Sequence, residues 1–375
     1  MSRPSTFASE LPAGAFFRAG LGRALPPGYI RIGVAITTPE VLRSLNVDPV
    51  PLCREAGVPM SLFSDPDNCL PMRTLGRLVT LAVAATGRTD LGLLIAESVT
   101  ASTLGLTGFL LKQAPDVRTA LQDLVRYMHY NDRCAVPLLE VKEGLATFSY
   151  LVIEPGVSAT DQINDGAMLI LRNILRALCG PRWVPLGVTL SRPRPPAPAR
   201  YERAFGAPVV FDAEASTMTF AESWLDVPLP HADPALRRML QEQIDLMEEE
   251  AAGDFPEKVR RLMRACLITR ACSIDEISAL LQINRRTLSR RLEETGTSFR
   301  TISSEIHYEI ARQLIENTAL SMTQIALVLR FSEASAFTRA FRHWSGMSPR
   351  AWRQRHRARA RTARLSGEAL AEVAE

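Results

Sequence analysis

Lysine is scarce in this chain of 375 residues: Lys112, Lys142 and Lys258 are the only three, and Arg carries the rest of the basic charge. No apolar run reaches the length of about 18 residues that a membrane-spanning helix requires. The N-terminus lacks the basic start and apolar stretch of a secretory signal. These absences predict a cytoplasmic protein. A composition of 46% apolar and 22% charged residues is typical of globular domains, and the length allows two of them.

Signatures of catalysis are also absent. The sequence contains no GxSxG, P-loop, GxGxxG or HExxH motif. The five histidines are scattered, and no motif singles out a pair of acidic residues. Catalytic residues and cofactors are therefore not expected, although an enzyme is the rival class of function.

The six cysteines form no CxxC pair and have no zinc-ligand spacing, so no metal site is expected. Most of them lie in apolar stretches, which favours free, buried thiols over a redox switch. The six are Cys53, Cys69, Cys134, Cys179, Cys266 and Cys272.

One pattern occurs twice in the last third of the chain. The first copy, from Ile274 to Phe299, reads IDEISALLQINRRTLSRRLEETGTSF, and the second, from Met322 to Pro349, reads MTQIALVLRFSEASAFTRAFRHWSGMSP. The offset between matched residues drifts from 48 to 50. Matched pairs are Ile277 and Ile325, Leu281 and Leu329, Leu288 and Phe337, Leu292 and Phe341, and Gly296 and Gly346. Such a repeat indicates two similar supersecondary units.

Each copy has the pattern of a helix, a tight turn and a second helix. In the first copy, Asn284 is placed to cap the second helix and Gly296 to end it. In the second copy, Ser332 is the expected cap. The residues expected in the core of the second helices are Leu288, Leu292, Phe337, Phe341 and Trp344. The other faces carry Arg, which is typical of helix-turn-helix units that read DNA.

The basic charge is concentrated in the same region. The segment from Ala271 to Arg364 holds 16 Arg and 8 Asp or Glu, a net charge of +8, whereas the whole chain carries +4. The remaining residues therefore sum to −4. A basic segment joined to a slightly acidic one suits a protein that binds a polyanion. General use of Arg in place of Lys would explain the Arg content alone, and the repeat is what favours DNA binding.

The runs RRTLSRRLEETGTSF and IALVLRFSEASAFTRAFRHWSGMSPRAWR resemble the AraC/XylS family of bacterial transcription regulators. The resemblance implies two helix-turn-helix units joined by a long helix, here about Thr301 to Asn317, that read successive segments of the major groove. One departure is Arg330, where the second copy usually has glycine. If the turn needs a positive φ there, Arg costs about 1 kcal/mol relative to glycine.

The resemblance also assigns roles to side chains. Residues expected to face base edges are Arg286, Ser289, Arg290, Ser335, Thr338 and Arg339. Residues expected to face phosphates are Asn284, Arg285, Ser332 and Arg342, of which the two Arg could equally face solvent. Arg makes a bidentate contact with guanine that is worth about 1–3 kcal/mol of discrimination. Helix starts are suited to phosphates because backbone amides point at them.

Residues 36–232 have the pattern of an α+β domain. Two β-rich runs, Ala135–Lys142 and Ala146–Ile153, are separated by Glu143-Gly144, which predicts a hairpin. A long buried helix is expected over Asp161–Leu178. Shorter helices and strands are expected before and after this helix.

The expected plan is an α+β domain followed by an all-α DNA-binding domain. Its parts are a flexible arm (1–35, loose at least to Gly33), a ligand-sensing and dimerisation domain (36–232), a connecting helix and linker (233–253), the DNA-binding domain (254–356) and a basic, disordered tail (357–375). The helix-turn-helix units are expected at 274–296 and 322–346. The connecting helix is expected to bury Leu236, Met239, Leu240, Ile244 and Met247 on one face.

The runs LGLTGFLLKQAPDVRTALQDLVRY, RWVPLGVTLSRPRPP and FGAPVVFDAEASTMTFAESWLDVPLPHADPAL resemble the effector and dimerisation domain of one AraC subgroup, typified by an ornithine-utilisation regulator. The resemblance implies a homodimeric, one-component activator that senses a small molecule, binds double-stranded promoter DNA and contacts RNA polymerase. No ligand residue carries over, because members of this subgroup do not share one ligand. One alternative stays open, a regulator whose N-terminal domain only dimerises. A DNA-bending protein without a ligand is a further rival, but the large α+β domain of about 200 residues exceeds what simple DNA binding needs and argues against it.

Overall fold

A computed structural model describes residues 15–19, 25–26, 28–154, 156–250, 255–256, 259–260, 262–263, 273–281, 283–318 and 320–356. The chain divides into two compact units, residues 1–254 and residues 255–375. Each unit has a core of its own.

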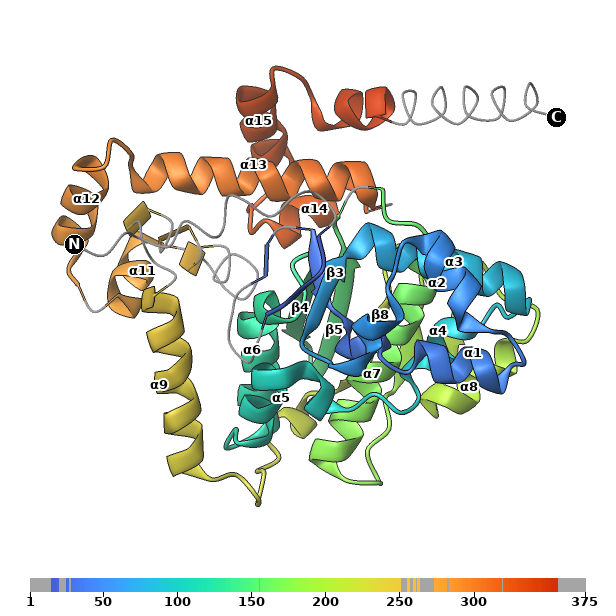
Figure 1. Cartoon of the computed structure of the whole chain (residues 1–375). Helices are drawn as coiled ribbons and strands as arrows, with labels where there is room; N and C mark the ends of the chain where they lie inside the picture. Colours follow the sequence, from blue (N-terminus) through green and yellow to red (C-terminus); the bar gives the residue numbers. More distant parts are fainter. Residues whose placement is uncertain are drawn as a thin grey trace. The chain divides into compact units, whose positions relative to one another are not determined.

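The N-terminal unit combines helices with two sheets (Figure 1). Its α-helices are α1 (Thr38–Ser44), α2 (Pro49–Ala56), α3 (Met72–Thr86), α4 (Leu91–Ala96), α5 (Gly105–Lys112), α6 (Val117–Tyr127), α7 (Thr160–Cys179), α8 (Pro198–Phe205) and α9 (Pro234–Glu250). Its 3-10 helices are η1 (Ile32–Ala35), η2 (Met60–Ser64), η3 (Ala101–Leu104), η4 (Met128–Tyr130) and η5 (Glu222–Asp226). Its strands are β1 (Phe17–Arg18), β2 (Tyr29–Arg31), β3 (Asn68–Pro71), β4 (Ala135–Lys142), β5 (Leu145–Val152), β6 (Gly187–Thr189), β7 (Val209–Val210) and β8 (Thr217–Ala221).

The larger sheet is built on a tight hairpin. β4 and β5 pair antiparallel along their full length. The two residues between them, Glu143 and Gly144, have φ values of +54° and +78°, as in the type I′ turn that matches the twist of paired strands. The strand order is β4-β5-β8-β6-β7, in which β6 and β7 pair parallel and the other neighbours antiparallel. The predicted hairpin is confirmed.

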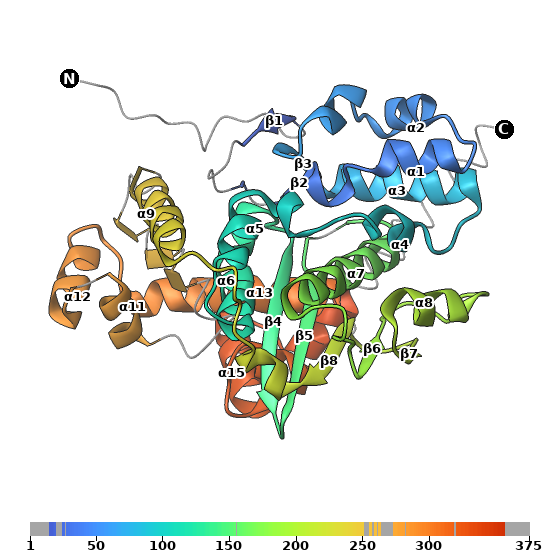
Figure 2. The same cartoon turned by 90° about the horizontal axis from the view of Figure 1, so that it is seen from below.

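Where β5 pairs with β8, buried and less buried residues alternate along both strands. Phe148 of β5 pairs with Met218 of β8, and both are almost completely buried. The neighbouring pair, Thr147 and Thr219, points to the opposite face and joins its hydroxyls at 3.2 Å. Figure 2 shows α6 and α7 alongside β4 and β5, which they contact. The period of two along this part of β5 and along β8 therefore places the apolar side chains on one face.

The smaller sheet corrects the prediction that residues 1–33 form a loose arm. β1 and β2 pair antiparallel with β3, and β2 is entirely buried. The Arg31 guanidinium lies in the core, where Nη1 donates to Asp67 Oδ1 at 2.8 Å and Nε donates to the Tyr130 carbonyl at 2.6 Å. The prediction was wrong here because a strand of three residues has no detectable periodicity and its partner strand lies far along the sequence.

Helix α9 buries less of its apolar face than the sequence predicts. Ile244 is buried, but Leu236 and Met239 are exposed, so the prediction is wrong for these two residues. The physical reason lies in the first turn, where Arg237 takes the inward place. Its Nη1 donates to Oδ2 of the buried Asp123 at 2.7 Å. A buried carboxylate needs a charged partner more than an apolar neighbour.

The regular elements among the described residues of the C-terminal unit are all helices. Its helices are α11 (Ile274–Leu280), α12 (Arg285–Glu293), α13 (Phe299–Asn317), α14 (Met322–Val328) and α15 (Ala334–Ser345), and residues 349–356 are also helical. Figure 1 shows α13 running from α12 toward α14 and α15. The buried side chains of α13 are Ile302, Ile306, Ile310, Ala311, Leu314 and Ile315. The predicted joining helix is therefore confirmed, and it begins two residues earlier than expected.

None of the helices in the described part of the chain combines the length and apolar content that crossing a bilayer requires. The described cysteines are free thiols: Cys53, Cys69, Cys134 and Cys179. Burial raises the pKa of the Cys69 thiol to about 11, so this thiol is protonated at neutral pH. The remaining predicted thiols, Cys266 and Cys272, and the side chain of Met247 lie outside the described residues.

Gly108 of α5 lies where a larger side chain has no room. A Cβ at this position would come within 1.6 Å of the Ala101 carbonyl oxygen in η3. We expect Gly108→Ala to lower the free energy of unfolding by about 1–3 kcal/mol, because α5 and η3 must separate. Alanine would otherwise favour the helix. Urea denaturation of the full-length protein measures this change.

Gly187→Ala is the matched control, because its Cβ would meet nothing closer than the Pro208 carbonyl at 3.9 Å. We expect this variant to unfold like the wild type, within about 0.5 kcal/mol. Equal stability of Gly108→Ala and the wild type would contradict the close approach of α5 and η3.

Candidate functional site

The two helix-turn-helix units begin with the same capping structure. In the first, the Glu276 amide donates to Ser273 Oγ at 3.2 Å, and the Glu276 carboxylate accepts from the Ser273 amide at 2.9 Å. Ser321 and Gln324 form the same two bonds in the second unit, at 3.2 and 2.6 Å. This arrangement of two reciprocal hydrogen bonds is a capping box. It supplies acceptors for backbone amides that the first turn of a helix would otherwise leave without partners. The sequence repeat is thus a repeat of backbone structure.

The turns inside the two units also share a pattern. The Ile283 amide donates to the Ser278 carbonyl at 3.0 Å, and the Phe331 amide donates to the Ala326 carbonyl at 2.9 Å. In the second unit this bond closes a Schellman motif, in which the residue just before the donor is left-handed. That residue is Arg330, with a φ of +59°. The departure from glycine therefore falls on a position of positive φ.

Two buried side chains, four residues apart, hold the second helix of each unit. Leu288 and Leu292 in α12, and Phe337 and Phe341 in α15, are 0% exposed. Because residues at this spacing share one face of a helix, the opposite face is turned away from the core. The predicted core is confirmed for these four residues. Trp344 is only half-buried, so its assignment to the core is wrong in part.

The residues predicted to read bases lie on the outward faces of α12 and α15. The exposed ones are Arg286, Arg290, Ser335 and Arg339, and the half-buried ones are Ser289 and Thr338. In each helix the three residues follow the spacing i, i+3, i+4, so they form one strip. Arg290 Nε lies 3.6 Å from Glu294 Oε1. An exposed pair of this kind is worth only about 0.3–0.5 kcal/mol, so the guanidinium is released at little cost.

The two hydroxyls of α15 are held within their own helix. Thr338 Oγ1 donates to the Ala334 carbonyl at 2.8 Å, and Ser335 Oγ donates to Glu333 Oε2 at 2.8 Å. Both hydroxyl oxygens keep lone pairs that accept hydrogen bonds. The strip therefore offers acceptors as well as the Arg donors.

The residues predicted to face phosphates, Asn284, Arg285, Ser332 and Arg342, are all exposed. Asn284 caps α12 as predicted, because its Oδ1 accepts from the Thr287 amide at 2.8 Å. Ser332 was predicted to cap α15, and this is wrong: the N-cap is Glu333, whose side chain makes no capping hydrogen bond. The second copy has one more residue than the first between its matched Leu329 and the start of its second helix. The turn absorbs the extra residue, which shifts the cap by one.

Aromatic side chains join α13 to the second unit. His307 lies 5.7 Å from the Phe331 ring, and Tyr308 lies 6.3 Å from the Trp344 ring, between centroids. Burial lowers the pKa of His307, so its ring is neutral at pH 7. These contacts make α13 part of the core that supports α15.

Two family profiles match the chain in series. The N-terminal arabinose-binding domain of AraC transcription regulators matches residues 47–229, and a helix-turn-helix domain matches residues 277–355. The chain belongs to the AraC family of transcription regulators. The second match of this AraC-family protein runs from within α11 past the end of α15, so it spans both helix-turn-helix units.

Two relatives of this AraC-family regulator align over more than nine-tenths of their own length. It is 26% identical over 320 residues to the HTH-type transcriptional regulator VirS of Mycobacterium tuberculosis. The aligned residues make up 84% of this chain and 93% of VirS. It is 25% identical over 360 residues to the ornithine utilization regulator of Pseudomonas aeruginosa, covering 94% and 99%. The crystal structure of the transcriptional regulator CdpR from Pseudomonas aeruginosa aligns at 21% identity with a TM-score of 0.43, over 84% of this chain and 96% of that chain. The family is one of DNA-binding regulators and not of enzymes.

The N-terminal unit of this AraC-family regulator holds a cavity of about 110 Å³. Its walls come from α3, α4, α6, α7 and the inner face of β5. The apolar lining includes Val79, Ile95, Leu124, Phe148, Met168 and Leu171, and the polar lining consists of Asn131, Asp132, Tyr150 and Gln162. The sequence analysis did not predict this cavity. Its lining residues come from many separate segments, and in each segment they have the same apolar pattern as residues of a close-packed core.

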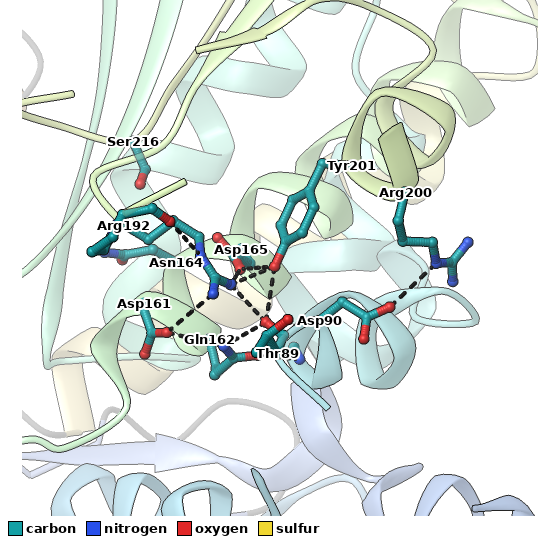
Figure 3. Close-up of polar contacts among 12 residues, drawn as sticks. Thr89, Asp90, Asp161, Gln162, Asn164, Asp165, Arg192, Arg200, Tyr201 and Ser216 are labelled. Atoms are coloured by element: carbon teal, nitrogen blue, oxygen red, sulfur yellow. Dashed lines mark hydrogen bonds and ion pairs between the residues drawn. The ribbon is translucent and has the colours of Figure 1, made fainter. Parts of the chain in front are cut away.

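A buried polar cluster borders the cavity (Figure 3). Arg192 Nη1 donates to Asp165 Oδ2 at 2.5 Å and to the Thr89 carbonyl at 2.7 Å, and the Tyr201 hydroxyl donates to Asp165 Oδ2 at 3.0 Å. Gln162, which lines the cavity, donates to the same Thr89 carbonyl at 2.9 Å. Burial raises the pKa of Asp165 to about 7, against the lowering effect of Arg192. The cluster ties α7 and α8 to the loop before α4.

Arg330 provides a test of the second turn. We expect Arg330→Gly to raise the free energy of unfolding of the C-terminal unit by about 1 kcal/mol, because glycine adopts φ +59° without a Cβ penalty. Hydrogen exchange of the α14 and α15 amides in the full-length protein measures this change. Arg330→Ala keeps the Cβ and is the control, with an expected change within about 0.5 kcal/mol. If both variants stabilised the unit equally, backbone strain would not be the cause.

Proposed function

We propose that this protein is a one-component regulator that reads promoter DNA with α12 and α15 and responds to a small molecule bound in its N-terminal unit. The observation that carries the DNA-reading part is the equivalence of Arg290 and Arg339. Each follows the first buried residue of its helix by two positions, and each is exposed. In a promoter contacted by both helices, Arg290 and Arg339 would each contact base edges in one segment of the major groove.

The proposed roles follow the two faces of each helix. Base edges are contacted by Arg286, Ser289 and Arg290 of α12 and by Ser335, Thr338 and Arg339 of α15. Phosphates are contacted by Asn284, Arg285, Ser332 and Arg342. The Arg side chains supply the bidentate donors that recognise guanine, and the hydroxyls supply adaptable contacts.

The length of α13 supports the simultaneous use of both units. This helix has 19 residues, which corresponds to about 28 Å at 1.5 Å per residue. Successive major-groove segments on one face of B-DNA lie about 34 Å apart. A rigid helix of this length is therefore suited to present α12 and α15 to neighbouring segments of the groove.

The cavity supports the response to a small molecule. Binding sites for small molecules are concave, mostly apolar and largely pre-formed, and this cavity has an almost entirely apolar lining. A small apolar molecule that entered it would bury its surface against these side chains. In this proposal residues 36–232 sense the ligand and pair two chains, residues 254–356 bind DNA, and the family resemblance favours activation through RNA polymerase.

Arg290→Ala and Arg339→Ala test the reading of bases. We expect each substitution to weaken binding to the preferred DNA site by about 1–3 kcal/mol and to relax the preference at one base pair, because a bidentate contact is lost. Fluorescence anisotropy at fixed salt, with the preferred site and a scrambled site, measures both effects.

Arg54→Ala is the charge-matched control, since Arg54 is exposed on α2 in the N-terminal unit. This variant should bind both DNA fragments like the wild type. An equal loss of affinity on the preferred and scrambled sites for Arg290→Ala or Arg339→Ala would assign that residue to phosphates and remove it from the base-reading set.

A further inference from the structure

Helix α15 begins with an acidic residue that does not cap it. The N-cap residue is Glu333, and its side chain makes no capping hydrogen bond. Each of the helices α11 to α14 begins instead at a Ser or Asn whose side chain accepts from an amide of the first turn. Those caps are Ser273, Asn284, Ser298 and Ser321. Capping therefore explains the residues at four helix starts and leaves the glutamate at the fifth unexplained.

The Glu333 carboxylate is bound to the strip of residues that α15 offers to base edges. Its Oε2 accepts from Ser335 Oγ at 2.8 Å, and Ser335 belongs to that strip. Both side chains are exposed. Glu333 forms no ion pair with any residue in the described part of the chain. The second carboxylate oxygen, Oε1, is consequently available to a partner outside the protein.

The hydrogen bond between these two side chains also decides what Ser335 offers. Because its hydroxyl proton is donated to Glu333, the Ser335 oxygen is left with lone pairs that accept. The start of α15 therefore presents acceptors, whereas Arg339, one turn beyond Ser335, presents donors. The N-terminal residues of a recognition helix are those that contact base edges. The group that meets Glu333 on DNA must then be a donor.

Donors on the major-groove edges of bases are the amino groups of cytosine and adenine. The adenine amino group lies beside N7, which is itself an acceptor and repels a carboxylate oxygen. The cytosine amino group has no acceptor of the same base beside it in the groove, and Glu is a known partner of cytosine N4. A phosphate carries the same sign of charge as Glu333 and is excluded as its partner.

We propose that Glu333 is a further specificity-determining residue, which reads a cytosine in the DNA segment contacted by α15. The inference rests on the proposed function, in which α15 reads bases. Glu333 and Arg339 are six residues apart, or about 9 Å along a helix. At a rise of about 3.4 Å for each base pair, the cytosine lies within about three base pairs of the guanine that Arg339 contacts.

The first helix-turn-helix unit has no counterpart of this carboxylate. Its corresponding cap is Asn284, whose Oδ1 accepts from the Thr287 amide and so is used within α12. The two DNA segments are therefore read by different chemistry, one by Arg donors and hydroxyls and the other also by a carboxylate. Such a site has a direction, which fixes the orientation of each chain on the promoter.

Glu333→Gln tests the reading of cytosine. Glutamine has nearly the same shape, but its amide is suited to N6 and N7 of adenine. Selection of bound DNA from a random pool is carried out in parallel with full-length wild type, Glu333→Gln and Arg339→Ala. The wild-type motif is expected to contain a cytosine within about three base pairs of the position that Arg339→Ala relaxes. Glu333→Gln is expected to lose this cytosine or replace it with adenine, with the block read by α12 unchanged.

Fluorescence anisotropy at fixed salt gives the size of the effect. The two fragments are the wild-type site and the same site with adenine in place of the cytosine. We expect the wild type to favour cytosine at least about fivefold, as for one mismatched base pair, and Glu333→Gln to abolish or reverse this ratio. Glu55→Gln removes the same charge from an exposed position on α2 and should keep the wild-type ratio.

A purely structural role would give a different result. If Glu333 only stabilised the start of α15 through the helix dipole, Glu333→Gln would weaken binding to both fragments equally. That result, or an unchanged motif, would overturn the inference, while two blocks in the wild-type motif would leave the proposed function standing. Absence of any motif with the wild type would contradict the proposed function and, with it, this inference.

Discussion

The DNA-binding surface depends on the burial of two side chains, four residues apart, in the second helix of each unit. In α12 these side chains are Leu288 and Leu292, and in α15 they are Phe337 and Phe341. Because both side chains of a pair must face the core, they fix the rotation of the helix about its own axis. Truncation of either Phe would cost on the order of 3–5 kcal/mol. The exposed strip is therefore a consequence of core packing, and the Arg side chains need no contacts of their own to be presented.

In the N-terminal unit the core forms where helices α6 and α7 pack against strands β4 and β5. Helix α7 packs tightly at its start, where a Cβ on Gly92 would come within 2.0 Å of the Gln162 carbonyl. Further along α7 the side chains leave a cavity, with Asn131 at its wall. Outside the cavity, the ion pair between Arg192 and Asp165 joins the same helix to the segment that follows β6. Tight packing around an unfilled space suits a binding site with preformed walls.

Local patterns predicted much of this fold, and the failures have physical causes. The hairpin at Glu143 and the long helices carry strong periodicity or turn signals, and the structure confirms them. Strand β2 escaped detection because three residues make no pattern. The cap at Glu333 was misplaced because one inserted residue in a turn leaves the helical spacing on both sides intact. The cavity and the Arg192 cluster depend on contacts between distant segments, which no local pattern encodes.

The most direct measurement is selection of bound DNA from a random pool by the purified full-length protein at moderate salt. If α12 and α15 both read bases, the enriched sequences will contain two conserved blocks about one helical turn, 10–10.5 base pairs, apart. Enrichment of a single block would mean that only one unit reads sequence. Binding without any enriched motif, lost as salt rises, would show a general attraction to phosphates and contradict the central claim.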